Sequence, residues 1–208
     1  MTDKLTSTDV QDLLKDPTPE NRAEAAKKVS NHFNSGSLTE NERKIAEDIF
    51  KVMVRDAEER VRLALSDSLK NNPDVPHDVA VSLAHDVIGV AMPMLEFSDV
   101  LTDDDLKEIV TRQGADSQLA VARRGHLSAE VSDAIVENSK DEEVIATLVS
   151  NDGAELKEDT MDKVLDKYGT LEKVNGSLAS RGQLPIGIAE RLVSLVSEKV
   201  RDHLVTHH

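Results

Sequence analysis

The chain of 208 residues contains no cysteine and no tryptophan, and its aromatic side chains are three phenylalanines and one tyrosine. The absence of cysteine excludes disulfide bonds and thiolate chemistry. The shortage of aromatic rings argues against a surface that stacks on nucleic-acid bases or on sugars, because such surfaces use flat π systems. A buried core must therefore be built from Leu, Val, Ile, Ala and Met.

Long hydrophobic runs are also missing. No stretch approaches the roughly 20 apolar residues that a membrane-spanning helix requires. The opening segment MTDKLTSTDVQDLL lacks the apolar run of a secretion signal. These absences predict a soluble, cytoplasmic protein.

Basic residues are outnumbered, with 25 Lys and Arg against 40 Asp and Glu, and the formal net charge is −15. The excess lies in residues 56–208, which carry 16 basic and 30 acidic side chains, whereas residues 1–55 carry 9 and 10. An acidic surface repels phosphate groups, so nucleic acids and anionic membranes are disfavoured as partners. An alternative interpretation is that the acidic surface serves only to keep the protein soluble.

Local motifs of known chemistry are absent. The sequence has no Gly-rich phosphate loop, nucleophile elbow, zinc-ligand spacing or dinucleotide fingerprint. His203 and His207 have the i, i+4 spacing of a metal pair, but they end the chain, where a tag remnant explains them equally well. His77 and His85 have no nearby carboxylate in ligand register. We therefore expect no catalytic, cofactor-binding or metal-binding residues.

Acidic clusters fall at the starts of predicted helices, where negative charge meets the positive end of the helix dipole. They are Asp103–Asp105, Asp141–Glu143, and Glu155 with Glu158 and Asp159. A structural role accounts for all of them.

An internal repeat is the main feature that is present. The stretch ARRGHLSAEVSDAIV at 122–136 returns as ASRGQLPIGIAERLV at 179–193 without a gap, and an Arg–Gly pair holds the same place in both. Aliphatic anchors recur at intervals of 26 to 29 residues, at Val75, Leu101, Leu127, Leu156 and Leu184. A second aliphatic set lies six residues earlier, at Leu69, Leu95, Val121 and Leu178, with Val149 one place out of step. Repeats of this length are typical of stacked supersecondary units.

Each repeat is expected to form a helix, a turn and a second helix. Apolar residues follow every anchor at spacings of three and four, which places one stripe on a helix. The first helix of a repeat is expected to stop at one of four turns, Asn71–Pro73, Arg124–Gly125, Asp152–Gly153 and Arg181–Gly182. In the last three of these turns, glycine is expected at the C′ position. Pro76 and Pro185 are expected at the first helical position, and Thr102 and Ser128 at N-caps. Pro93 should kink its helix, and strand signals are absent.

We therefore predict an all-α protein, a right-handed α-solenoid of about five HEAT-like helix-turn-helix repeats with an N-terminal helical cap. The cap spans 1–55, with helices over 7–15, 19–33 and 39–55, and the third presents Ile45, Ile49, Phe50, Met53 and Val54. The array spans 56–208 and ends in a longer helix over 186–205. The first segment either caps the stack or dimerises, and the last helix either seals the stack or docks on a second chain, so a homodimer is left open.

Three arginines are the candidate binding residues. Arg124 and Arg181 occupy the same repeat position, and Arg123 lies beside the first. In one interpretation they cap helix carbonyls and neutralise acidic neighbours. In the other they form a ridge whose guanidinium groups bind a carboxylate or phosphate on a partner or ligand.

The segments RVRLALSDSLKNNPDVPHDVAVSLAHD and VAMPMLEFSDVLTDDDLKEIV resemble an alphaproteobacterial family classified as a domain of unknown function, DUF2336. The likeness is clearest over residues 60–136. The resemblance implies HEAT-like helical repeats and brings no established catalytic residues.

The sequence thus favours a non-enzymatic interaction scaffold or adaptor in bacterial regulation or signalling, with a basic or amphipathic protein segment as its partner. The alternative is a sensor of an anionic small molecule, or an enzyme, that uses the arginine ridge.

Overall fold

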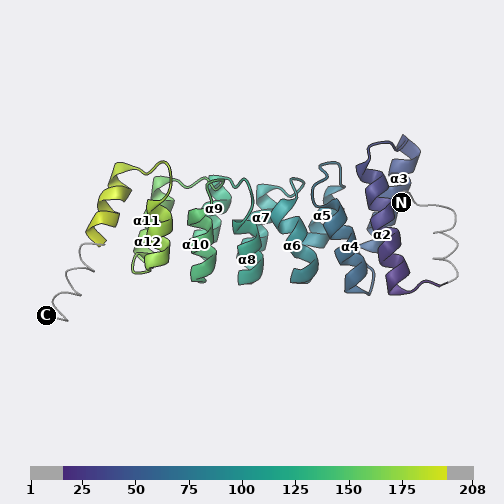
Figure 1. The fold of residues 1–208 in the computed structure, drawn as a ribbon, viewed down its shortest axis with the longest axis horizontal. Helices are drawn as coiled ribbons and strands as arrows, with labels where there is room; N and C mark the ends of the chain where they lie inside the picture. The colour runs from purple at the N-terminus through teal and green to yellow at the C-terminus, as the bar shows by residue number, and fades with distance from the viewer. Residues whose placement is uncertain (1–15, 196–208) are drawn as a thin grey trace. The chain divides into compact units, whose positions relative to one another are not determined.

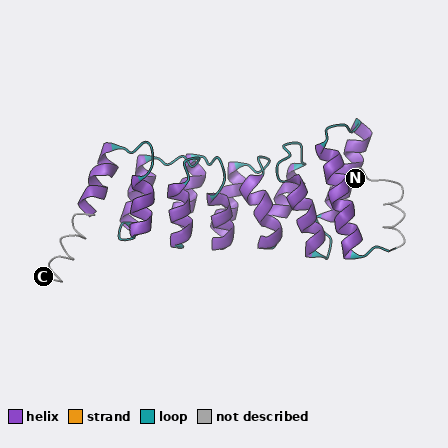
Figure 2. Ribbon diagram, viewed as in Figure 1, coloured by secondary structure: helices purple, strands orange, loops and turns teal. Residues whose placement is uncertain are grey.

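A computed structural model describes residues 16–195 of the chain. Throughout this range the regular secondary structure is α-helical, and helices follow one another in hairpin pairs (Figures 1 and 2). The all-α prediction is confirmed for the described residues, whose β pairing is limited to an isolated parallel bridge between Leu127 and Ala154. The predicted helix over 7–15, the end of the last predicted helix and the histidines at 203 and 207 lie outside the described residues.

The chain divides into two units, Met1–Asp105 and Leu106–His208. The predicted boundary after residue 55 falls inside the first unit. Helix α7 (Asp103–Arg112) contains the boundary between the units.

In the first unit, the first helices of successive hairpins pack side by side: α2 lies against α4, and α4 against α6 (Figure 1). The helices of this unit are α2 (Pro19–Asn34), α3 (Glu40–Met53), α4 (Glu59–Leu69), α5 (His77–Ala84) and α6 (Ile88–Phe97). The predicted N-terminal segment therefore has the same hairpin arrangement as the residues that follow it.

The second unit repeats this arrangement, because α8 packs against α10 and α10 against α12, while α9 packs against α11. Its helices are α8 (Ala115–Ala122), α9 (Ala129–Asn138), α10 (Glu142–Ser150), α11 (Glu158–Tyr168) and α12 (Glu172–Ala179). Residues 186–195 are also helical.

The predicted core positions in the first helices are confirmed. Their exposed fraction is 0% in every repeat, at Leu69, Leu95, Val121, Val149 and Leu178. Val149 is buried although it lies one residue out of step, and Ala154 in the loop between α10 and α11 is also buried. The anchors Val75, Leu101 and Leu127 are buried, whereas Leu156 and Leu184 are half-buried.

The second helices that follow Pro76 and Pro185 begin one residue later than predicted. Pro76 is the N-cap of α5, with an extended ψ of 133°, and not its first helical residue. Thr102 and Asp105 bond reciprocally: the Asp105 amide donates to Thr102 Oγ1 over 3.3 Å, and the Thr102 amide donates to the Asp105 carboxylate over 2.8 Å. Ser128 caps α9 by accepting from the Val131 amide. The predicted caps at 102 and 128 are thus confirmed.

Glycine acts differently from the prediction at the hairpin turns. Among the described residues only Gly36, in the loop after α2, has a positive φ, of 65°. Gly125, Gly153 and Gly182 therefore do not end their helices through a left-handed conformation. Gly153 is required for another reason, because a Cβ atom there would lie 2.1 Å from the carbonyl oxygen of Gly125.

Two further predictions concern the kink at Pro93 and the apolar face of the third helix. Helix α6 continues through Pro93 as one helix. On α3, Phe50 is buried and meets the Phe33 ring edge-on at 5.1 Å, but Ile45 is 60% exposed. The apolar face predicted for α3 is thus only partly covered.

Arginines at the fourth position of α2 and α4 connect neighbouring hairpins of the first unit. Arg22 forms two hydrogen bonds to the Asp56 carboxylate, of 2.7 and 2.9 Å, and Arg62 forms two to Asp86, of 2.5 and 2.8 Å. Each also donates to a backbone carbonyl that precedes its own helix, at Pro17 and Asp56 respectively. The hydrogen bonds from Arg62 hold the pKa of Asp86 below its ordinary value of 3.8, although burial opposes them.

The Arg62–Asp86 pair predicts an acid-sensitive contribution to stability. Because the pKa of Asp86 is lowered by folding, the pair stabilises the native state above about pH 4, and this stabilisation is lost as the pH falls through the folded-state pKa. We expect Asp86→Asn to lower the free energy of unfolding by about 1–2 kcal/mol at pH 7 and by less at pH 3. Urea unfolding at both pH values tests this. Arg62→Gln should give the same pattern, and an equal loss at the two pH values would contradict it.

A second set of ion pairs connects the second helices of the other unit. Lys163, the sixth residue of α11, contacts Asp133 and Glu137 of α9, each over 2.8 Å. Arg191, at the matching place in the helix over 186–195, contacts Asp162 and Asp166 of α11. The flanking carboxylates raise the pKa of Lys163. Such exposed pairs add little stability singly, but their repetition favours one register between helices.

Candidate functional site

The three candidate arginines lie in the turns after α8 and α12 and differ in exposure. Arg123 is the C-cap residue of α8 and is exposed. Arg124 is only 6% exposed. The Asn151 side chain donates to the carbonyl oxygens of Ala122 and Arg124, over 2.9 and 2.7 Å, and so joins this turn to the turn after α10. The structure therefore places Arg123 on the surface and Arg124 inside.

Arg181 caps the end of the preceding first helix, α10. Its guanidinium group donates to the carbonyl oxygens of Val149, Asn151 and Ala154, over 3.1, 3.0 and 2.7 Å. Carbonyl groups at a helix C-terminus lack intrahelical donors, so a cation that binds them is stabilising. Arg181 and Arg124 thus share a repeat position, and Arg181 makes its hydrogen bonds within the fold.

Removal of this cap should destabilise the second unit. We expect Arg181→Ala to lower the free energy of unfolding by about 1–3 kcal/mol, because charge-assisted hydrogen bonds to three carbonyl groups are lost. Arg123→Ala, which removes an exposed arginine, should change it by less than about 0.5 kcal/mol. Urea unfolding of the two variants side by side tests this. Equal, small effects would show that Arg181 is not a structural cap.

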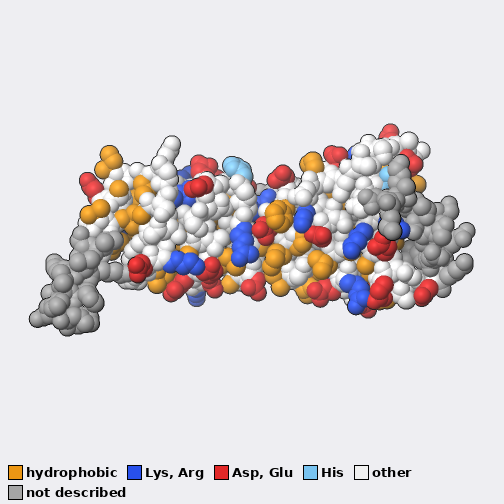
Figure 3. All heavy atoms as spheres, viewed as in Figure 1, with side chains coloured by type: hydrophobic (Ala, Val, Ile, Leu, Met, Phe, Trp, Pro, Cys, Tyr) orange, Lys and Arg blue, Asp and Glu red, His pale blue; other side chains and the backbone are white. Residues whose placement is uncertain are grey.

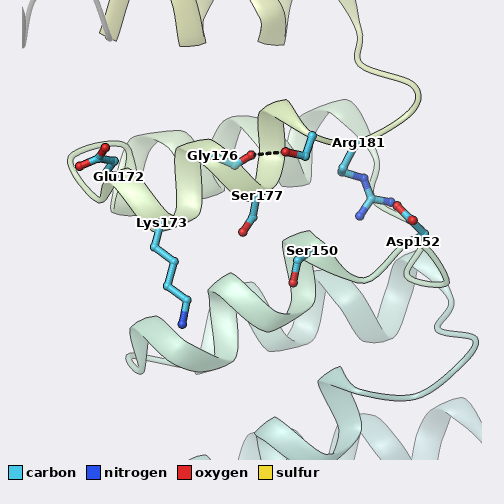
Figure 4. A pocket seen from close by; sticks show the side chains of 8 residues that line it. Ser150, Asp152, Glu172, Lys173, Gly176, Ser177 and Arg181 are labelled. Carbon is cyan, nitrogen blue, oxygen red and sulfur yellow. Dashed lines mark hydrogen bonds between the residues drawn. The ribbon is translucent and has the colours of Figure 1, made fainter.

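An open groove of about 790 Å³ lies between α10 and α12, beside Arg181 (Figure 4). It is lined by Ser150, Asp152, Glu172, Lys173, Gly176, Ser177, Ser180 and Arg181. In Figure 4 the Lys173 side chain points from α12 toward α10, where it pairs with Glu143. Both cations of the groove are therefore engaged with other protein groups, and Gly176 and the serines give it a small-residue, polar surface.

The histidines and carboxylates show one contact that the sequence did not reveal. His77 Nε2 lies 2.8 Å from Asp105 Oδ2, although the two residues are 28 positions apart. Burial tends to raise the pKa of Asp105, but the hydrogen bonds from Thr102 and His77 outweigh it and the pKa is lowered. The sequence places no carboxylate in ligand register with His77, and Asp105 reaches it only because packing brings the start of α7 to the start of α5.

The acidic clusters occupy the predicted places, except that Glu155 lies in the loop before α11 and outside its first turn. Asp103–Asp105, Glu142 with Glu143, and Glu158 with Asp159 lie in first helical turns, and Asp141 caps α10. Within residues 16–195, no group of three or more His, Asp or Glu side chains is arranged to hold a metal ion. In the same range, no helix has both the length and the apolar character needed to cross a membrane.

Residues 90–208 match the model of a family described as an uncharacterised protein conserved in bacteria, DUF2336. The chain belongs to the DUF2336 family. The DUF2336 match begins inside α6 and includes the whole second unit, with the three arginines and the groove, whereas the clearest likeness noted in the sequence was over 60–136. No curated protein and no solved structure matches the chain.

Sequence reasoning missed one surface feature that the DUF2336 match only partly covers. Leu63 of α4, Met92 and Phe97 of α6, and Val87 at the N-cap of α6 are large apolar side chains with exposed fractions of 38, 37, 46 and 51%. Met92 and Phe97 lie within the matched residues and the other two lie before them. The signal in the sequence was α6 itself, IGVAMPMLEF, in which Glu96 is the one charged residue.

Proposed function

We propose that this protein is a non-enzymatic, cytoplasmic scaffold or adaptor of bacterial regulation or signalling that binds a basic or amphipathic segment of another protein. Each unit is, in this proposal, a stretch of right-handed α-solenoid made of HEAT-like hairpins. The HEAT-like character and an alphaproteobacterial origin come from the family resemblance and are part of the proposal.

The observation that carries the proposal is the alignment of first helices within each unit. α2, α4 and α6 pack in succession, as do α8, α10 and α12. Residues at the same helix position therefore form continuous rows along an exposed face, and such faces are the binding surfaces of helical-repeat proteins. The net charge of −15 favours a basic partner.

The anion sensor or enzyme is the less supported alternative. It needs guanidinium groups that face a ligand, whereas Arg181 donates to three backbone carbonyls and Arg124 is buried. A thermal-shift screen against nucleotides and phosphorylated metabolites tests this alternative, since a ligand that binds the native state raises the melting temperature. A saturable rise that disappears in Arg123→Ala would favour the sensor.

The scaffold is tested by affinity capture with the full chain from the bacterium that encodes it. We expect one protein to be recovered in stoichiometric amount, and its retention to weaken as salt increases from about 0.05 to 0.5 M because exposed charges are then screened. The absence of any stoichiometric protein partner would contradict the proposed function.

A further inference from the structure

An apolar patch lies on the exposed face of α4 and α6. We define the α4–α6 patch as Leu63, Met92 and Phe97, whose exposed fractions are 38, 37 and 46%. In Figure 3 hydrophobic side chains gather over α6 and between α4 and α6, with acidic and basic side chains beside them. Single exposed apolar residues are ordinary, but neighbouring ones on two packed helices mark an interaction surface.

Contacts near both ends of α4 and α6 fix the register between the two helices. Near the start, a Cβ atom on Gly89 would lie 2.9 Å from Glu59 Oε1, so α4 and α6 are close there. At the other end, Lys70 Nζ lies 5.0 Å from the centroid of the Phe97 ring. Leu63 and Met92 are both the fifth residue of their helices and are therefore level with each other.

Helix α6 has more large apolar residues than it buries in the core of the unit. Val90, Ala91, Met94 and Leu95 are its buried residues and supply the packing against the unit. A helix with a single charged residue, as α6 has in Glu96, is normally buried around most of its surface. Met92 and Phe97 are nevertheless in contact with solvent, so nothing within residues 16–195 covers this face of the helix.

The charges around the patch have one dominant sign. From Asn71 to Leu106 the sequence contains eight acidic residues and no Lys or Arg. Glu59 and Asp67 on α4 are exposed, and Glu96 on α6 is half-buried. The basic groups of α4 are engaged within the fold: Arg60 pairs with Glu20 and Arg62 with Asp86. Lys70 pairs with Asp67 over 2.7 Å and lies over the Phe97 ring. A partner that covers the apolar side chains must bring positive charge to this rim.

We propose that the α4–α6 patch is the docking surface for a basic amphipathic helix of a partner protein. The apolar residues of that helix, three and four positions apart, cover Leu63, Met92 and Phe97, and its Lys and Arg side chains reach Glu59, Asp67 and Glu96. The inference rests on the proposed scaffold function and specifies its site and the chemistry of its partner.

The test uses the full chain and a fluorescein-labelled amphipathic peptide of 18 residues made of leucine and lysine, followed by fluorescence anisotropy. The variant Leu63→Lys/Met92→Lys places two cations in the patch. Its matched control is Val52→Lys/Val193→Lys, which adds the same charge at exposed valines, 72 and 68% accessible, outside the patch. We expect the patch variant to bind the peptide at least about tenfold more weakly, since central apolar contacts dominate such interfaces, and the control to change affinity less than about twofold.

Several results would overturn the inference. Equal weakening in both variants would mean that the peptide responds only to overall charge. Equally tight binding of a leucine–glutamate peptide would exclude a preference for basic helices. A dimer of the unmodified chain in sedimentation, converted to a monomer by Leu63→Lys/Met92→Lys, would make the patch a self-association surface. A captured cellular partner that binds the patch variant normally would refute this site but leave the scaffold function in place. Circular dichroism establishes that both variants are folded.

Discussion

Replacement of Leu95 by alanine should lower the free energy of unfolding by about 2–5 kcal/mol, because a fully buried leucine in α6 is removed and the cavity is only partly refilled. Leu95 is 0% exposed and occupies the core position that recurs in every hairpin. Since each helix is short, its stability comes mainly from packing against its neighbours. Urea unfolding followed by circular dichroism measures the change.

Leu63→Ala is the matched control for this prediction. Leu63 lies on the neighbouring helix α4 in the same unit and is 38% exposed. The same chemical change there removes less buried surface, and we expect a loss below about 1.5 kcal/mol. If the two leucine substitutions had equal effects, the recurring aliphatic position would not be the core of the hairpin.

Gly153→Ala should destabilise the second unit by about 1–3 kcal/mol, the range for forcing extra volume into a packed site. The new Cβ atom would lie 2.1 Å from the Gly125 carbonyl oxygen, so one of the two turns must move. That movement would break the bridge in which the Leu127 amide donates to Gly153 O over 3.0 Å and the Glu155 amide to Leu127 O over 2.9 Å.

Gly125→Ala provides the control within the same pair of turns. A Cβ atom at Gly125 meets no atom within 4 Å, and the φ of this residue is not positive. Because alanine also restricts the unfolded chain more than glycine does, we expect a change within about 0.5 kcal/mol or a slight gain. A loss as large as that of Gly153→Ala would mean that loop flexibility, and not the close backbone approach, makes glycine necessary.

The candidate site was predictable only in part, for a physical reason that the arginines illustrate. Their recurrence at one repeat position is visible in the sequence, but the atoms they contact belong to the preceding hairpin. Arg181 binds carbonyls about 30 residues upstream, at Val149 and Asn151. No local pattern records which carbonyl groups a neighbouring turn presents. The same holds for His77 and Asp105, which meet only because the hairpins stack.

The exposed patch on α4 and α6 shows a related limit. The residue composition of α6 predicts an apolar helix, but it does not predict how much of the helix surface is covered by neighbouring helices. That quantity depends on which helices pack against it, and α4 and α5 cover only part of its surface. Exposure of Met92 and Phe97 is therefore a property of the assembled unit.

By itself the sequence determined the helical character, the spacing of the hairpins and the aliphatic positions of their core. The reason is that burial of one helix face requires apolar residues at helical spacing, and this spacing is visible in the sequence. Tertiary structure alone decided the division near residue 105, the partners of Arg22, Arg62 and Arg181, and the need for glycine at 153. Each of these depends on groups that are distant in the chain and meet only when one hairpin lies on the next.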